Sequence, residues 1–105
     1  MPDLAPPEAC RSMPELRAAI DILDARLVAM LALRQTYIDR AAVLKSARGA
    51  VLDTARVEQV VENVVVEAAR VGLSPAIAEA VWRALIEASI AHEYEVFDAK
   101  TSAAP

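Results

Sequence analysis

The hydrophobic pattern is most regular between Pro14 and Lys45, a stretch that contains no glycine and no second proline. Its apolar residues recur in steps of three and four, which places them on one face of a helix. These positions are Leu16, Ile20, Leu23, Leu27, Met30, Leu31, Ile38 and Ala41. The preceding Ser12-Met13-Pro14-Glu15 has the form of a capping box, with Ser12 as the cap. The pattern therefore predicts one long helix over this stretch.

A second helix is predicted after a loop at residues 46–52, where Gly49 interrupts the period. Asp53 can cap this helix and Gly72 can end it. Its apolar positions are Val57, Val60, Val61, Val64, Ala68 and Val71. Three consecutive valines at 64–66 suit a strand by propensity, but the helical period and the length of the segment favour a helix.

The start signal is repeated at Ser74-Pro75, which predicts a third helix ending near Ala99. Its stripe consists of Ala78, Val81, Trp82, Leu85 and Val96. Residues 1–12, with Pro2, Pro6 and Pro7, read as an extended lead-in, and residues 100–105 as a flexible tail. We therefore expect an all-α, three-helix domain over residues 13–99.

The long helix is too long for a monomeric globule of this size. A compact chain of 105 residues has a radius of gyration of about 13 Å, whereas a helix from Pro14 to Lys45 is about 48 Å long. The part of its apolar stripe that extends beyond the globule has to be buried against a second subunit. The expected solution is a homodimer with antiparallel long helices. A composition of 56% hydrophobic and 4% aromatic residues also favours helices over a sheet sandwich.

Charge and composition exclude several function classes. The net charge is −4 and the basic residues are dispersed, so we expect no nucleic-acid partner. Cys10 is the single cysteine and His92 the single histidine, so no metal site is predicted. The start of the chain does not resemble a signal peptide, and the longest apolar run, Leu27 to Leu33, is too short to cross a bilayer. We expect a cytoplasmic protein without a membrane partner.

Polar residues interrupt two of the apolar stripes. Arg34 and Lys45 occupy inward positions of the first helix, about 20° apart around its axis and about 16 Å apart along it. In the third helix, Ser89 and Glu93 also occupy inward positions on the apolar stripe. The cations can form an anion pocket or extend to solvent at the margin of the stripe. Similarly, Glu93 can line a site or form a structural ion pair with a lysine.

Several of these positions carry a resemblance to a known family. The stretch Glu15 to Asp24 reads ELRAAIDILD, and it is followed by Leu33-Arg34, by Lys45 and by Asp53-Thr54-Ala55-Arg56. From about Glu15 to Phe97 the chain resembles the all-helical, AroQ-type chorismate mutases. The resemblance implies an intertwined homodimer with shared active sites. It also implies an isomerase of the shikimate pathway and aromatic amino acid biosynthesis, which converts chorismate to prephenate without a cofactor.

The resemblance also assigns roles to single residues. Arg17 would enter the site of the other subunit, and with Arg34 it would hold the two carboxylates of the substrate. Lys45 would donate to the ether oxygen. Asp53, Arg56 and Val57 would line the site from the loop and the second helix, and Ser89 and Glu93 would close it from the third helix. The helical spacing agrees with a cross-subunit role for Arg17. It lies about 25 Å along the helix from Arg34, so one chain cannot bring both side chains to a small ligand.

Glu93 needs a proton for a donor role, because an ionised carboxylate cannot donate to an ether oxygen. Burial favours the protonated form and nearby Lys45 favours the ionised form, so the sequence leaves the balance open. Many mutases have glutamine at this position, and other members have glutamate.

A second departure gives an alternative function. At Val57 the mutases commonly have a glutamate that contacts the ring hydroxyl of the substrate. Here, and in Pro7-Glu8-Ala9-Cys10, the chain resembles the related isochorismate-pyruvate lyases, which form salicylate. Ser89 matches the mutase pattern, so a mutase is the preferred function and a lyase the alternative. A third alternative, from another class, is a non-catalytic helical dimerisation or regulatory module, against which the inward cations argue.

Overall fold

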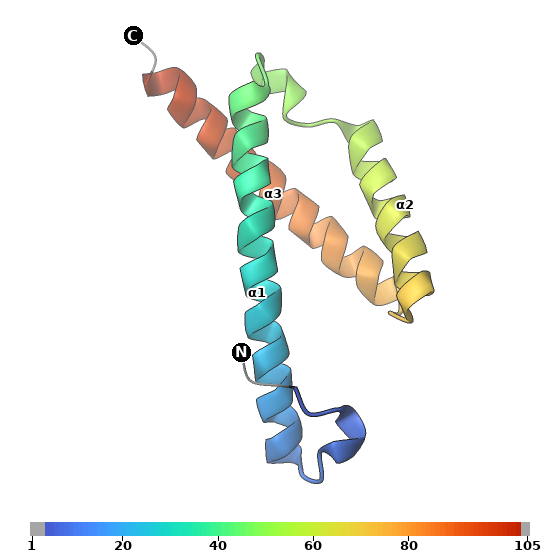
Figure 1. The fold of residues 1–105 in the computed structure, drawn as a ribbon. Helices are drawn as coiled ribbons and strands as arrows, with labels where there is room; N and C mark the ends of the chain where they lie inside the picture. The colour runs from blue at the N-terminus through green and yellow to red at the C-terminus, as the bar shows by residue number, and fades with distance from the viewer. Residues whose placement is uncertain (1–3, 104–105) are drawn as a thin grey trace. The chain divides into compact units, whose positions relative to one another are not determined.

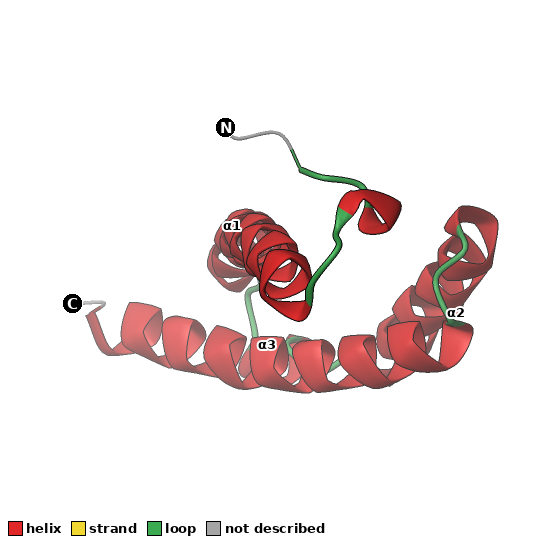
Figure 2. Ribbon diagram, turned by 90° about the horizontal axis from the view of Figure 1, so that it is seen from below, coloured by secondary structure: helices red, strands yellow, loops and turns green. Residues whose placement is uncertain are grey.

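The computed structural model describes residues 4–103, which form helices joined by loops, with no strand among these residues (Figures 1 and 2). The element order is a 3-10 turn η1 (Pro7–Ala9), α1 (Met13–Leu44), a second 3-10 turn η2 (Arg48–Ala50), α2 (Thr54–Val71) and α3 (Pro75–Ala103). The predicted all-α class with three helices and a very long first helix is confirmed. The valines at 64–66 are helical, as their period predicts.

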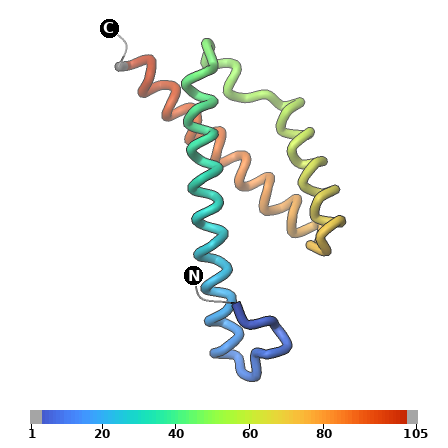
Figure 3. The backbone as a smooth tube through the Cα atoms, viewed as in Figure 1, coloured from blue at the N-terminus to red at the C-terminus, as the bar shows by residue number. Residues whose placement is uncertain are grey.

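The chain divides into two compact units, Met1–Thr36 and Tyr37–Pro105. The division falls within α1, so the first unit holds the lead-in and most of that helix. The second unit holds the last turns of α1 together with η2, α2 and α3. The tube in Figure 3 follows the chain through these elements.

The first unit differs from the sequence prediction in its lead-in. Residues 7–9 form the turn η1 rather than extended chain, because Pro7 supplies a suitable φ in the first position. The backbone amides of Ala9 and Cys10 then donate to the carbonyls of Pro6 and Pro7 at 2.9 and 3.1 Å. Residues 1–3 lie outside the described part of the chain.

The predicted capping box at the start of α1 is present in an altered form. The backbone amide of Glu15 donates to Ser12 Oγ at 3.3 Å. The Glu15 carboxylate reaches back to the amide of Arg11 at 2.8 Å, one residue before the cap. The first contact satisfies an amide of the first helical turn that has no partner within the helix, and the second satisfies the amide just before the cap. They explain why α1 begins at Met13.

The apolar stripe of α1 is exposed along the first unit. Leu27 is 59% exposed and Met30 63%. Ile20, Leu23 and Leu31 are each more than two-fifths exposed. An apolar row of this length on a single chain is typical of an interaction surface.

In the second unit, α2 and α3 form a helical hairpin whose ends are set by the predicted signals. Asp53 accepts from the amide of Arg56 at 3.1 Å and caps α2. Gly72 ends it with φ of 83°, in the left-handed region that favours glycine. Ser74 Oγ then accepts from the amide of Ile77 at 3.4 Å at the start of α3.

The core of the second unit includes a cluster that joins the end of α1 to α3. Ala42, Val51 and Phe97 are buried together, and Ile90, Tyr94 and Val96 pack against them. A polar contact supports the same junction, since His92 Nε2 lies 2.6 Å from Asp39 Oδ1. The last turns of α1 are therefore fixed against α3.

The sequence prediction ends α3 too early. The helix continues past Ala99 to Ala103, so residues 100–103 are the last turn of α3. Lys100 contacts the end of α1, and Thr101 Oγ1 donates to the carbonyl of Asp98 at 3.0 Å. These contacts hold the last turn, whereas residues 104–105 lie outside the described part. None of the helices in residues 4–103 combines the length and apolar character needed to cross a membrane.

Candidate active site

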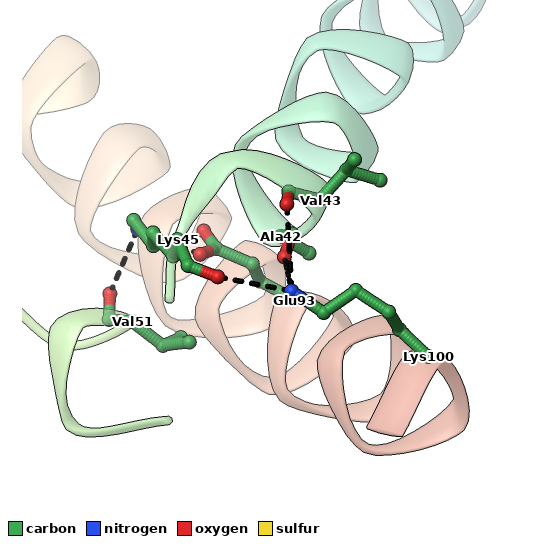
Figure 4. Close-up of polar contacts among 6 residues, drawn as sticks. All are labelled: Ala42, Val43, Lys45, Val51, Glu93 and Lys100. Atoms are coloured by element: carbon green, nitrogen blue, oxygen red, sulfur yellow. Dashed lines mark hydrogen bonds and ion pairs between the residues drawn. The ribbon is translucent and has the colours of Figure 1, made fainter. Parts of the chain in front are cut away.

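The centre of the candidate site is a contact between Lys45 and Glu93. Lys45 follows the last residue of α1, and its amide donates to the carbonyl of Ala41 at 3.0 Å, which continues the helical pattern. Its ammonium nitrogen lies 2.6 Å from Glu93 Oε2 (Figure 4). Glu93 is 4% exposed. A buried carboxylate needs a partner of this kind, and a charge-assisted hydrogen bond is a strong one.

The loop that contains η2 adds a second, longer contact to the ammonium group. Lys45 Nζ lies 3.5 Å from the carbonyl oxygen of Val51, whose side chain is buried in the core cluster. An ammonium group has three donors, so these two contacts leave capacity for a further acceptor. The Lys45 side chain keeps 30% of its surface exposed. It is thus held in place and still accessible to a ligand.

The loop itself is attached to α3 through Arg48. Its guanidinium group donates to Asp98 at 3.0 Å and lies over the ring of Tyr94, 4.3 Å from the centroid. The hydrogen bond with Asp98 raises the pKa of Arg48, so the cation persists at any ordinary pH. Arg48 thus holds η2 against α3, directly before Val51 and the carbonyl that faces Lys45.

The residues predicted to line the loop side lie at the start of α2. Asp53 is engaged as the helix cap, and Arg56 is exposed, with its Nη1 donating to Gln59 Oε1 at 2.8 Å. Val57 is half-buried. Ser89 is half-buried on α3, one turn before Glu93. Of the predicted residues of the second unit, Lys45 and Glu93 are in side-chain contact, and Asp53 contacts the backbone of Arg56.

The two predicted carboxylate-binding arginines belong to the first unit. Arg17 is exposed and Arg34 half-buried on the same unbroken helix. A separation of 17 residues corresponds to about 25 Å along the axis and about 100° around it. One chain therefore cannot place both guanidinium groups on one small ligand.

One residue near the site is missed by the sequence prediction. Lys100, assigned there to the tail, donates to the carbonyls of Ala42 and Lys45, each at 2.9 Å. The available signal is its position seven residues after Glu93, which places both side chains on one face of α3. The predicted stripe ends at Val96, before Phe97 and Lys100.

Comparisons with known proteins bear on the whole arrangement. A comparison with curated proteins finds no match. The family model of chorismate mutase type II matches residues 16–94. The matched segment begins just before Arg17 and ends just after Glu93, so it contains every candidate residue of both units. Because the match covers most of the 105 residues, the chain belongs to the chorismate mutase type II family.

Proposed function

We propose that this protein is a chorismate mutase that rearranges chorismate to prephenate. The observation that carries the proposal is the family match, because it spans all the residues that the chemistry needs. The part-buried contact between Lys45 and Glu93 supports it further. A concerted rearrangement requires a compact substrate conformer and donors at the oxygen where charge develops. It requires no nucleophile and no cofactor.

The chemistry assigns one task to each group of residues. Arg34 and Arg17 hold the two substrate carboxylates, since guanidinium groups bind carboxylates with two parallel hydrogen bonds. Lys45 donates to the ether oxygen as the carbon–oxygen bond breaks and the new carbon–carbon bond forms. Protonated Glu93 is the second donor to this oxygen. Asp53, Arg56, Val57 and Ser89 complete the walls of the site.

The working protein in this proposal is a homodimer. Arg17 and Arg34 are too far apart on one helix to meet at a small ligand, so Arg17 serves the site of the second subunit. The exposed residues Leu27 and Met30 provide an apolar surface for such a partner. Fully burying a large apolar side chain is favourable by about 1.5 to 3 kcal/mol, before the entropy lost on association is subtracted.

A second candidate function rests on Val57. A half-buried valine cannot accept a hydrogen bond from a ring hydroxyl, so the position at which many mutases contact this hydroxyl is apolar here. Isochorismate carries its ring hydroxyl elsewhere, and an isochorismate-pyruvate lyase would release salicylate and pyruvate. Ser89 favours the mutase.

The experiment that separates the candidates is incubation of the purified protein with chorismate and, separately, with isochorismate. We expect prephenate from chorismate, and a higher kcat/KM for chorismate than for isochorismate. Salicylate and pyruvate from isochorismate, without prephenate, would establish the lyase instead. Failure to convert either substrate would leave the non-catalytic module as the function.

A further inference from the structure

The C-terminus of α1 is capped from another helix. The last carbonyls of a helix have no amide partner within it, and α1 lacks a glycine directly after Leu44 that would turn the chain back. Lys100 of α3 takes this role, because its ammonium group lies 2.9 Å from the carbonyls of Ala42 and Lys45 and 3.4 Å from that of Val43 (Figure 4).

The location suits a cation for two further reasons. The C-terminus of a helix carries the negative end of its dipole, so an ammonium group is stabilised there. The Lys100 nitrogen also lies 4.3 Å from the centroid of the Phe97 ring, within the range of a cation–π contact. Phe97 is buried in the core cluster, which anchors the lysine on its apolar side.

The consequence for Lys45 is that α3 holds this residue at both ends. Lys100 binds its backbone carbonyl, and Glu93 binds its side-chain nitrogen at 2.6 Å. The two holding residues are seven positions apart, two helical turns on one face of α3. The backbone of Lys45 lies just beyond α1, where a helix end frays most easily.

We propose that Lys100 is a positioning residue, which fixes the end of α1 so that the Lys45 ammonium group is aligned with the ether oxygen of the substrate. The proposal rests on the function proposed above. Lys100 touches no reacting atom in it and acts through Lys45. A displacement of about 1 Å in a reacting group can slow a reaction by about 10²-fold, so a loosened helix end is sufficient to impair turnover.

The first test compares Lys100→Met with Lys100→Arg, which keeps a cation at the helix end. Arg83→Met is a matched control, because Arg83 also joins two elements of the second unit: it lies on α3 and pairs with Glu58 of α2 at 3.1 Å. We expect Lys100→Met to lower kcat about tenfold or more with KM changed less than about threefold. Lys100→Arg should recover most of kcat, and Arg83→Met should leave kcat unchanged.

The second test is a double-mutant cycle with Lys45→Ala. If Lys100 acts through Lys45, then Lys100→Met lowers kcat in the presence of Lys45 and has less than about a twofold effect in its absence. A role confined to stability predicts the same factor in both backgrounds. An equal loss in the Lys45→Ala background would overturn the proposal.

A third measurement does not depend on activity. The sequence contains two lysines, Lys45 and Lys100, so selective ¹³C-lysine labelling gives one side-chain signal for each. In Lys100→Met the remaining signal belongs to Lys45, and we expect it to move towards the position of a free lysine. It should stay in place in Arg83→Met. An unmoved Lys45 signal in folded Lys100→Met refutes the positioning role, even if the proposed function is correct.

The readouts also separate the two proposals from each other. If the wild type converts neither chorismate nor isochorismate, the proposed function fails, while the lysine signals still test the contact. Should Lys100→Met not fold, the same three measurements apply to Lys100→Ala, which removes both the charge and the donor. An unchanged kcat in Lys100→Ala together with an unmoved Lys45 signal would reject the proposal.

Discussion

Lys45 Nζ and Glu93 Oε2 lie 2.6 Å apart, and the carboxyl group is almost fully buried. The geometry suits an ammonium–carboxylate pair in the substrate-free chain. In this state Glu93 holds Lys45 in place, and with the anionic substrate bound it has to carry a proton to donate. A role as ion-pair partner of Lys45 and a role as protonated donor lead to different expectations for the Glu93→Gln variant.

We predict that Glu93→Gln retains activity and loses the alkaline decline of the wild type. In the wild type the donor role depends on the protonated form of Glu93, because an ionised carboxylate cannot donate to the ether oxygen. Glutamine is a donor at every pH. The measurement is turnover of chorismate by both proteins between about pH 5 and 9. If the glutamine variant shows the same decline, Glu93 is not the donor.

The exposed stripe of α1 predicts an obligate dimer. A dimer that unfolds to separate chains becomes more stable as the protein concentration rises, because association is linked to folding. Thermal unfolding at several concentrations should therefore show a rising midpoint. Leu27→Asp, which places a charge on a side chain that is 59% exposed in the single chain, should yield monomers. Sedimentation of the wild type as a monomer at micromolar concentration would contradict the shared site.

Arg17 and Arg34 predict a complementation experiment. An Arg17→Ala chain and an Arg34→Ala chain, each inactive as a homodimer, form mixed dimers on refolding together. One site of such a dimer has lost both arginines, and the other retains both. We expect half the wild-type activity per mixed dimer. Mixing that restores nothing would show that Arg17 does not act across the subunits.

Gly72 predicts a local cost in stability. Its φ of 83° lies in the left-handed region, and a methyl group added there would meet no neighbouring atom within 4 Å. The cost of Gly72→Ala is therefore conformational, about 1 kcal/mol. Gly49→Ala is the control, since Gly49 has equal space and no positive φ. Urea unfolding should show the loss for Gly72→Ala alone; equal stability of both variants would contradict the explanation.

Much of the fold is predictable because its signals are local. Ser12, Asp53, Gly72 and Ser74 each act within a few residues, and each contact or turn occurs where the sequence places it. The period of the apolar residues likewise predicts the helical state of the valines at 64–66. Local signals of this kind need no knowledge of the tertiary structure.

The parts that sequence reasoning misses depend on contacts between distant segments. Lys100 holds the end of α1, more than fifty residues earlier in the chain, and this contact extends α3 beyond the predicted Ala99. Arg48, likewise, belongs to a loop without a distinctive motif, and its contacts with Tyr94 and Asp98 follow only from the packing of η2 on α3. The sequence shows that Lys45 and Glu93 both interrupt apolar stripes. It leaves open whether Glu93 lines a site or pairs with a lysine, and the structure shows the pair with Lys45.

The most direct test of the proposed chemistry is prephenate formation from chorismate by the wild type and by Lys45→Ala under identical conditions. Loss of one preorganised donor costs about 3 kcal/mol in the transition state, or about 10²-fold in kcat. We predict this loss for Lys45→Ala with the dimer intact. Equal rates for the two proteins, or no prephenate from the wild type, would contradict the account.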